Sequence, residues 1–460
     1  MKLNVNLDIL KKYSRPGPRY TSYPTAPHFT PEFGPEDFER AIRESNHTAE
    51  NGDISLYFHF PFCPQLCYYC GCNVIISRNE ARINRYLEYL KKEIQLLRRL
   101  IHPDRKVTQM HWGGGTPNYL QPQQIRTIFQ AIRDAFPFTE DAEISVEIDP
   151  RTLTPEHLPL FRELGFNRLS FGVQDFEHQV QVTINRLQPE DMTRRVVEES
   201  RALGFPSINV DLIYGLPYQT EETFQRTIDK IIDISPDRLA VFNYAHVPWL
   251  KKHQRVIPEE ALPTLEVKLR LFKMTIEQLT EAGYVFIGMD HFARPDDELS
   301  IAQKTRTLYR NFQGYSPRAG AEVFALGITS ISQLQRIYAQ NVKDTRRYEQ
   351  LLDAGKIPTH VGIALTDDDV LRRHVINELM CNNRLQKPAV EARFRIQFDQ
   401  YFADALEALK PLQADGLVEL DSDEIRVTEQ GRFVVRNIAM AFDWYLKQES
   451  STKAIYSKTI

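Results

Sequence analysis

Short apolar segments alternate with amphipathic helical segments along most of this 460-residue chain, and this alternation restricts the possible folds more than any other feature. Six segments have the length and composition of buried strands: 55–61, 109–117, 143–150, 168–174, 208–217 and 238–245. Between them, apolar residues recur every three or four positions in 83–100, 125–136, 157–165, 191–204 and 223–234, as in helices. Helical crossovers join parallel strands, so the pattern predicts an α/β fold, either an open sheet or a closed or incomplete barrel.

The positions of the unusual residues favour a barrel. These residues lie at or just after the carboxyl ends of successive predicted strands: His59, Gly113–Gly115, Glu147, Gln174, Asp211 and Tyr244. Barrel enzymes build their active sites from this end of many strands, whereas an open sheet uses one switch point. We therefore expect an incomplete (β/α)6 TIM-like barrel over residues 51–335.

Two smaller regions flank the expected barrel. Residues 1–50 contain SRPGPRYTSYPTAP, whose prolines disfavour both helix and central strand, so this N-terminal arm is expected to wrap over another part of the chain. Residues 360–450 combine helical patterns with two short strands around Ser422 and Asp423. They predict a mostly helical, winged-helix-like C-terminal domain that acts as a scaffold or lid.

The charge of the chain excludes several partners. It has 57 basic and 61 acidic residues, a net charge of -4 and no long block of one sign, so neither nucleic acid nor a membrane surface is an expected partner. The amino-terminal segment lacks the apolar core of a signal peptide, and the cytoplasm is the expected compartment. Any anionic ligand has to be bound by local cations.

Four of the five cysteines lie in one segment, HFPFCPQLCYYCGCN, as Cys63, Cys67, Cys70 and Cys72, while Cys381 stands alone. A reducing compartment and the short spacing argue against disulfides. Structural zinc sites usually pair two separated knuckles, and no second pair follows here. Three thiolates at C-x-x-x-C-x-x-C spacing can instead bind three irons of a four-iron cluster and leave one iron open, which favours iron–sulfur over zinc.

The chain resembles a known family over nearly its whole length. The cysteine triplet after a first barrel strand is the signature of radical S-adenosylmethionine (SAM) enzymes, and CPQLCYYCGCN is similar to oxygen-independent coproporphyrinogen III oxidases. The same resemblance is carried by PRYTSYPTA, HWGGGTP, EIDP, FGVQD, NRLQ, DLIYGLP, NYAHVPW, GMDHFARPDDEL, RNFQGY and DGLVE.

The resemblance implies a set of cofactor ligands. Cys63, Cys67 and Cys70 would bind one 4Fe-4S cluster, Cys72 would lie outside the triplet, and two SAM molecules are implied, the second touching Ile331. The residues implied around SAM are Tyr57, Tyr69, Gly114, Gly115, Thr116, Glu147, Gln174, Arg186, Asp211 and the backbone of Ala245. Carboxylates can accept hydrogen bonds from amine and hydroxyl groups, an arginine can pair with a carboxylate, and Tyr69 can pack on adenine.

The implied reaction is anaerobic oxidative decarboxylation of two propionates of coproporphyrinogen III to vinyl groups, giving protoporphyrinogen IX in porphyrin and haem biosynthesis. A 5'-deoxyadenosyl radical would carry it out, so no further catalytic residue is assigned, and Asp149, near Glu147, is expected to cap the next turn. A reduced donor such as a flavodoxin or ferredoxin and an unidentified electron acceptor are the implied partners of a monomer. Arg19 in the arm is the candidate for binding the anionic substrate, against the alternative of a merely solvated arginine.

Two other functions remain open. A haem-binding chaperone of the same superfamily shares the triplet but generally lacks the PRYTSYPT-type arm and the cysteine two residues beyond, and both features are present here. A related radical methyltransferase acting on porphyrins is the other alternative.

Overall fold

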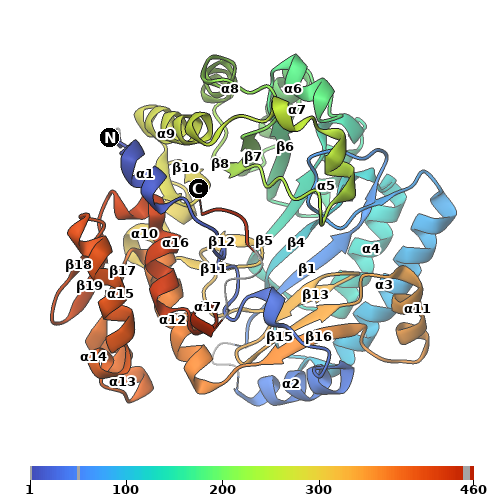
Figure 1. Cartoon of the computed structure of the whole chain (residues 1–460). Coiled ribbons are helices and arrows are strands. Elements are labelled where there is room, and N and C mark those ends of the chain that lie inside the picture. Colours follow the sequence, from blue (N-terminus) through green and yellow to red (C-terminus); the bar gives the residue numbers. More distant parts are fainter. Residues whose placement is uncertain (1–2, 49–51, 449–455, 460) are drawn as a thin grey trace.

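The computed structural model describes residues 3–48, 52–448 and 456–459. Its centre is a run of six parallel strands in chain order (Figure 1). They are β1 (Ile54–Phe60), β4 (Val107–Gly114), β5 (Phe138–Ile148), β6 (Arg168–Gln174), β7 (Ser207–Tyr214) and β8 (Arg238–Asn243). All six strands predicted from the sequence are confirmed.

Helices follow most of these strands and cover them. They are α3 (Glu80–Leu100), α4 (Pro122–Ala135), α5 (His157–Glu163), α7 (Glu190–Ala202), α8 (Glu221–Ile234) and α9 (Leu265–Glu281). Helix α3 begins after Asn79, whose side chain accepts a hydrogen bond from the backbone N–H of Arg82. Apolar residues at helical spacing bury one face of α3, and the strands contribute fully buried side chains such as Trp112 and Phe171.

The barrel is incomplete, as the sequence predicted. The run of six continues on one side through parallel β13 (Glu322–Leu326) and antiparallel β14 (Ile331–Gln333), β15 (Ile337–Asn341) and β16 (Thr359–Ala364). On the other side it ends with β10 (His291–Ala293) and β9 (Val285–Gly288). Within the described ranges, β9 and β16 do not pair with each other, so the sheet stays open.

The C-terminal part lies beside the barrel (orange to red in Figure 1). It contains α12 (Asp367–Asn382), α13 (Lys387–Phe394), α14 (Phe398–Tyr401), α15 (Ala403–Ala414), α16 (Val435–Ala439) and α17 (Trp444–Gln448). A small antiparallel sheet joins β17 (Arg384–Gln386), β19 (Glu424–Val427) and β18 (Val418–Leu420). The hairpin between β18 and β19 turns at Ser422 and Asp423, which confirms the winged-helix-like element.

The proline-rich stretch of the N-terminal arm is packed rather than solvated. Two helices that sequence reasoning did not foresee flank it: α1 (Leu7–Tyr13) and α2 (Pro35–Thr48). Between them, Tyr20 is buried and donates a hydrogen bond to Asp443 (2.9 Å), and Arg436 donates to the carbonyl of Pro18 (2.8 Å). The arm therefore contacts the C-terminal part directly. Among the helices of residues 3–48, 52–448 and 456–459, none combines the length and the apolar composition of a membrane span.

Candidate active site

A cavity of about 320 Å³ opens at the carboxyl ends of the parallel strands. Most residues singled out from the sequence line it: Cys63, Cys67, Tyr69, Cys70, Gly114, Gly115, Thr116, Glu147, Gln174, Arg186 and Asp211. They come from the loop after β1 and from β4, β5, β6, β7 and the segment after β6. This arrangement agrees with the rule that barrel enzymes place ligands at this end of the strands.

The cysteine loop is held at both ends. Its short flanking strands, β2 (Phe62–Cys63) and β3 (Ile75–Ile76), pair in parallel. The Sγ atom of Cys63 lies 3.2 Å from Oγ1 of Thr116. Burial raises the pKa of the Cys63 thiol to about 12, while hydrogen bonding with Cys72 lowers the pKa of Cys70 to about 7. Three thiols facing one cavity fit an iron–sulfur cluster, whose usual ligands are cysteine thiolates.

The glycine run at the end of β4 makes close packing possible. A Cβ on Gly113 would lie 2.9 Å from the carboxylate of Glu147, and one on Gly115 would lie 2.6 Å from the carbonyl carbon of Pro61. Gly114 has a φ of +110°, which L side chains rarely adopt. The resemblance implied that Gly114 and Gly115 lie beside SAM. The structure adds that the missing side chains let β4 contact both the cysteine loop and Glu147.

Two carboxyl groups in the cavity have opposite protonation tendencies. Burial opposes ionisation of Glu147, but hydrogen bonding with His111 (3.3 Å) and the N–H of Gly114 (3.0 Å) keeps its pKa below the usual value. Burial and the nearby charge of Glu147 raise the pKa of Asp211 to about 7, although Asn209 donates a hydrogen bond to it (2.7 Å). The cavity thus offers one firmly ionised acceptor and one that titrates near neutral pH.

Arg186 forms hydrogen bonds within the protein that the sequence did not predict. Its Nη1 lies 3.1 Å from Asp149, and its Nη2 donates to the carbonyl of Gly172 (2.6 Å). Arg151 also pairs with Asp149 (2.7 Å), and both guanidinium groups lie within 3.8 Å of the Sγ atom of Cys67. The Nε atom of Arg186 is buried without a hydrogen-bond partner.

The Asp149–Arg151–Arg186 cluster was missed by the sequence reasoning. Asp149 does cap the following turn, since it accepts from the N–H of Arg151 (3.0 Å), as predicted. Asp149 also forms an ion pair with Arg186, which is distant in the chain. The only local sign of this charge cluster is the Asp-x-Arg spacing of residues 149–151.

Three of the candidate cofactor-binding residues lie outside the cavity lining. Tyr57 stacks on His111 with ring centroids 5.9 Å apart. Ala245 follows β8 and is exposed, and its carbonyl accepts a hydrogen bond from Gln254 (3.2 Å). Ile331 lies on β14, which β13 separates from β1.

Arg19 lies close to the cavity but does not line it. Its guanidinium pairs with Asp290 and is 6.0 Å from the ring centroid of Phe242, a residue of the cavity lining. Burial and the nearby charges of Arg436 and Arg310 lower the pKa of Arg19 to about 9. Sequence reasoning missed these two further arginines, because β11 (Tyr309–Asn311) and α16 bring them to Arg19 from distant parts of the chain.

The fold and the site together define a radical SAM protein. Residues 57–231 match the Radical SAM superfamily, and residues 365–434 match the HemN C-terminal domain. Membership of this superfamily implies a 4Fe-4S cluster and SAM.

Comparison with individual proteins narrows the assignment. The chain is 48% identical to the oxygen-independent coproporphyrinogen III oxidase of Synechocystis over 98% of its length and 97% of that protein. The enzyme of that name from Escherichia coli is 45% identical over 98% of this chain and 97% of its own. A solved structure of coproporphyrinogen III oxidase from Escherichia coli, described as a radical SAM enzyme, superposes with a TM-score of 0.91 at 45% identity, covering 97% of this chain and all of that one. The chain belongs to the oxygen-independent coproporphyrinogen III oxidase family.

Proposed function

We propose that this protein converts two propionate side chains of coproporphyrinogen III to vinyl groups without oxygen, giving protoporphyrinogen IX. The observation that carries the proposal is the convergence of three cysteines, the glycine run and the Glu147–Asp211 acid pair on one cavity. When bound, the cluster and SAM would supply a 5'-deoxyadenosyl radical that takes a hydrogen atom from the carbon beta to each propionate carboxylate; carbon dioxide then leaves and one electron passes to an external acceptor.

The residues of the cavity have distinct binding tasks in this proposal. Cys63, Cys67 and Cys70 hold the cluster. Glu147, ionised at neutral pH, accepts hydrogen bonds from the amino group of SAM, and Asp211 accepts from its ribose hydroxyls. Arg186, a residue of the cavity lining, pairs with the carboxylate of SAM, while its ion pair with Asp149 fixes the guanidinium in place.

Further contacts of SAM come from the same lining. Tyr69 packs against adenine, Gln174 and Thr116 add polar side chains, and the backbone of Gly114 and Gly115 approaches the ligand. We place Tyr57 behind this layer, where it orients His111 by stacking. A second SAM molecule that touches Ile331 would lie outside the main cavity.

Substrate binding is assigned to the arginines beside the cavity. Arg19, Arg310 and Arg436 lie near one another, and Asp290 pairs with Arg19. Nη1 of Arg310 is buried without a hydrogen-bond partner. This local excess of positive charge suits a substrate with several carboxylates on a protein whose net charge is -4.

Anaerobic reconstitution with iron and sulfide tests the function. The reconstituted protein is incubated with coproporphyrinogen III, SAM and dithionite, and the tetrapyrrole is analysed by mass spectrometry. We expect loss of two carbon dioxide units together with formation of 5'-deoxyadenosine. Binding of haem without decarboxylation would instead identify a haem chaperone, and methyl transfer to the porphyrin would identify a methyltransferase.

A further inference from the structure

The backbone at the end of β6 is strained at the point where it brings Gln174 into the cavity. Gln174 has a φ of +73°, in the left-handed region that residues other than glycine rarely adopt. The N–H of Asp175 donates to the carbonyl of Val173 (3.0 Å), so Gln174 is the central residue of a three-residue turn. The pairing of β6 with β7 also passes over Val173, which forms a β-bulge there. Bulges and strained turns beside a cavity can re-aim a side chain.

This turn brings the side chain of Gln174 close to that of Arg186. A Cβ on Gly172 would lie 2.8 Å from Nε2 of Gln174 and 3.1 Å from Nη2 of Arg186, so both side chains occupy the space that a side chain at residue 172 would need. Both also line the cavity. A change in the turn would therefore move Gln174 relative to Arg186 and relative to a ligand in the cavity.

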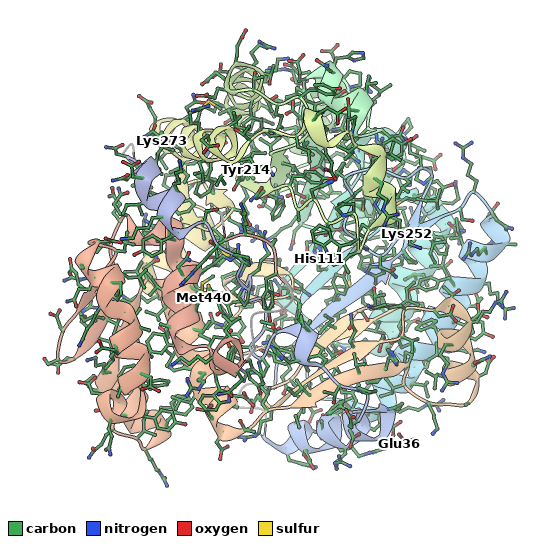
Figure 2. All side chains as sticks on the ribbon, viewed as in Figure 1. Glu36, His111, Tyr214, Lys252, Lys273 and Met440 are labelled. Atoms are coloured by element: carbon green, nitrogen blue, oxygen red, sulfur yellow. The ribbon has the colours of Figure 1, made fainter. Side chains whose placement is uncertain are left out.

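Asp175 directly follows the turn and is completely buried. Its carboxylate accepts hydrogen bonds from the N–H of Glu177 (2.7 Å), the hydroxyl of Thr227 (2.9 Å) and the side-chain amide of Gln219. Thr227 lies on α8, and Gln219 follows Tyr214, the last residue of β7, which Figure 2 labels. Burial raises the pKa of Asp175 to about 6, so at pH 8 the carboxyl is ionised and can accept from all three donors. One carboxylate thus connects the ends of β6 and β7 with α8.

Gln181, on α6 (His178–Thr183), extends this network to the segment that carries Arg186. Its Nε2 donates to the carbonyls of Asp175 (2.9 Å) and Gln188 (2.7 Å), and its Oε1 accepts from the N–H of Gln188 (2.9 Å). The N–H of Arg186 donates to the carbonyl of Gln181 (2.8 Å). Because Gln181 and Gln188 are buried, these hydrogen bonds are shielded from water. The backbone around Arg186 is therefore tied to Asp175.

We propose that Asp175 is a positioning residue for SAM binding, whose buried hydrogen-bond network holds the strained turn that places Gln174 beside Arg186 in the cavity. The inference rests on the proposed function, in which Gln174 and Arg186 contact SAM. Asp175 does not line the cavity, so it acts through these two residues. A strained conformation persists only where surrounding contacts fix it, and the three donors to Asp175 supply such contacts directly after the turn.

A role confined to the stability of the fold is the alternative, because the same carboxylate also joins two strands to a helix. The position of the strain favours the positioning role. A network needed only for stability gives no reason to keep an unfavourable φ at Gln174, a residue that lines the cavity.

Asp175→Asn tests the proposal, because it keeps the volume of the side chain but turns one accepting oxygen towards the donors into an amide. The matched control is Asp443→Asn, at a buried carboxylate of the C-terminal part that also accepts three hydrogen bonds. Its donors are the hydroxyl of Tyr20 and the N–H groups of Tyr445 and Leu446. SAM affinity of the reconstituted proteins is measured by equilibrium dialysis at pH 8, together with iron per chain and the midpoint of urea unfolding.

We expect the Kd for SAM to rise at least about tenfold in Asp175→Asn and to stay unchanged in Asp443→Asn, with iron per chain kept in both. The urea midpoint should fall in both variants. A Kd in Asp175→Asn within twofold of that of the wild type would overturn the proposal, and so would a loss of iron that accompanies the loss of SAM binding. If Asp175→Asn does not fold, Thr227→Val removes a single donor and should raise the Kd about threefold; an unchanged Kd would likewise overturn the proposal.

A double variant separates positioning from general damage. In Gln174→Gly the positive φ is unstrained and the amide is absent, so Asp175→Asn has no side chain left to mis-aim at that position. We expect the effect of Asp175→Asn on the Kd to be at least about threefold smaller in this background than in the wild type. Equal effects in both backgrounds would overturn the proposal.

The single Gln174→Gly variant distinguishes this inference from the proposed function. If it keeps the SAM affinity of the wild type, the proposed contact of Gln174 with SAM is wrong, and the positioning role falls with it. A loss of affinity in Gln174→Gly with none in Asp175→Asn would overturn the positioning role and leave the proposed contact standing.

Discussion

Replacing Asp149 by Asn should destabilise the barrel strongly while leaving its shape intact. Asn keeps the volume of the side chain and can still cap the next turn, but it removes the negative charge between Arg186 and Arg151. The side chains of these arginines are only 7% and 13% exposed, so the variant leaves two buried guanidinium groups without their counter-ion. Removing one partner of a buried ion pair costs about 3–5 kcal/mol.

The titration of Asp149 gives a second measure of the same effect. Burial opposes ionisation, but Arg186 and Arg151 outweigh it and lower the pKa from 3.8 to about 2. At about 1.4 kcal/mol per pKa unit, this shift corresponds to roughly 2–3 kcal/mol of stability. Because the folded-state pKa is depressed, that stability is present above pH 3.8 and is lost as the pH falls towards 2.

Urea unfolding followed by tryptophan fluorescence measures the loss of folding stability in the Asp149→Asn variant. Trp112 is fully buried in the barrel, whereas Trp249 and Trp444 are exposed, so the signal reports mainly on the barrel. The matched control is Asp141→Asn, which breaks an exposed pair with Arg318 and should cost at most about 1 kcal/mol. A barrel in the Asp149→Asn variant that is no less stable than in this control would refute the reasoning.

Four further outcomes are expected. Alanine at any one cysteine of the triplet should abolish iron incorporation, measured as iron per chain; retained iron would contradict the ligand assignment. Gly115→Ala should also reduce iron incorporation, because its Cβ would meet the backbone of Pro61, whereas Gly34→Ala, away from the cysteine loop, meets only a carboxylate oxygen of the flexible Glu36 side chain at 3.8 Å and should not. SAM affinity, measured by equilibrium dialysis, should rise as the pH increases through about 7, because Asp211 ionises there, and Asp211→Asn should flatten that profile. Arg19→Gln should raise KM for coproporphyrinogen III about tenfold or more, whereas Arg15→Gln, at an exposed position, should leave KM unchanged. Equal KM values for the two variants would show that Arg19 packs against the protein and does not bind the substrate.

Short-range patterns predicted the barrel and the cysteine triplet, whereas most other residues of the cavity, such as Tyr69 and Arg186, were implied by the resemblance to a known family. Strand and helix periodicity repeats within ten to twenty residues, and Glu147, Gln174 and Asp211 each lie at or near the end of a predicted strand. The cysteine triplet and the glycine run are likewise local, so Cys63 and Gly115 could be named without a structure.

The missed contacts of the site join residues that are distant in the chain. Asp149 meets Arg186, and Arg19 meets Arg436, only after the chain has folded, and no local pattern encodes either contact. Helices α1 and α2 were overlooked for a different reason. The prolines of residues 16–27 disfavour helix locally, and the prediction extended this effect to the whole arm. These prolines lie between α1 and α2 and do not interrupt either helix.

The central claim is that a radical formed in the barrel takes a hydrogen atom from the propionate side chain of a porphyrinogen. Coproporphyrinogen III carrying deuterium at the carbon beta to each propionate carboxylate tests it most directly, with the 5'-deoxyadenosine product analysed by mass spectrometry. We predict that deuterium is transferred to 5'-deoxyadenosine as the vinyl groups form. Vinyl products accompanied by unlabelled 5'-deoxyadenosine would contradict the account.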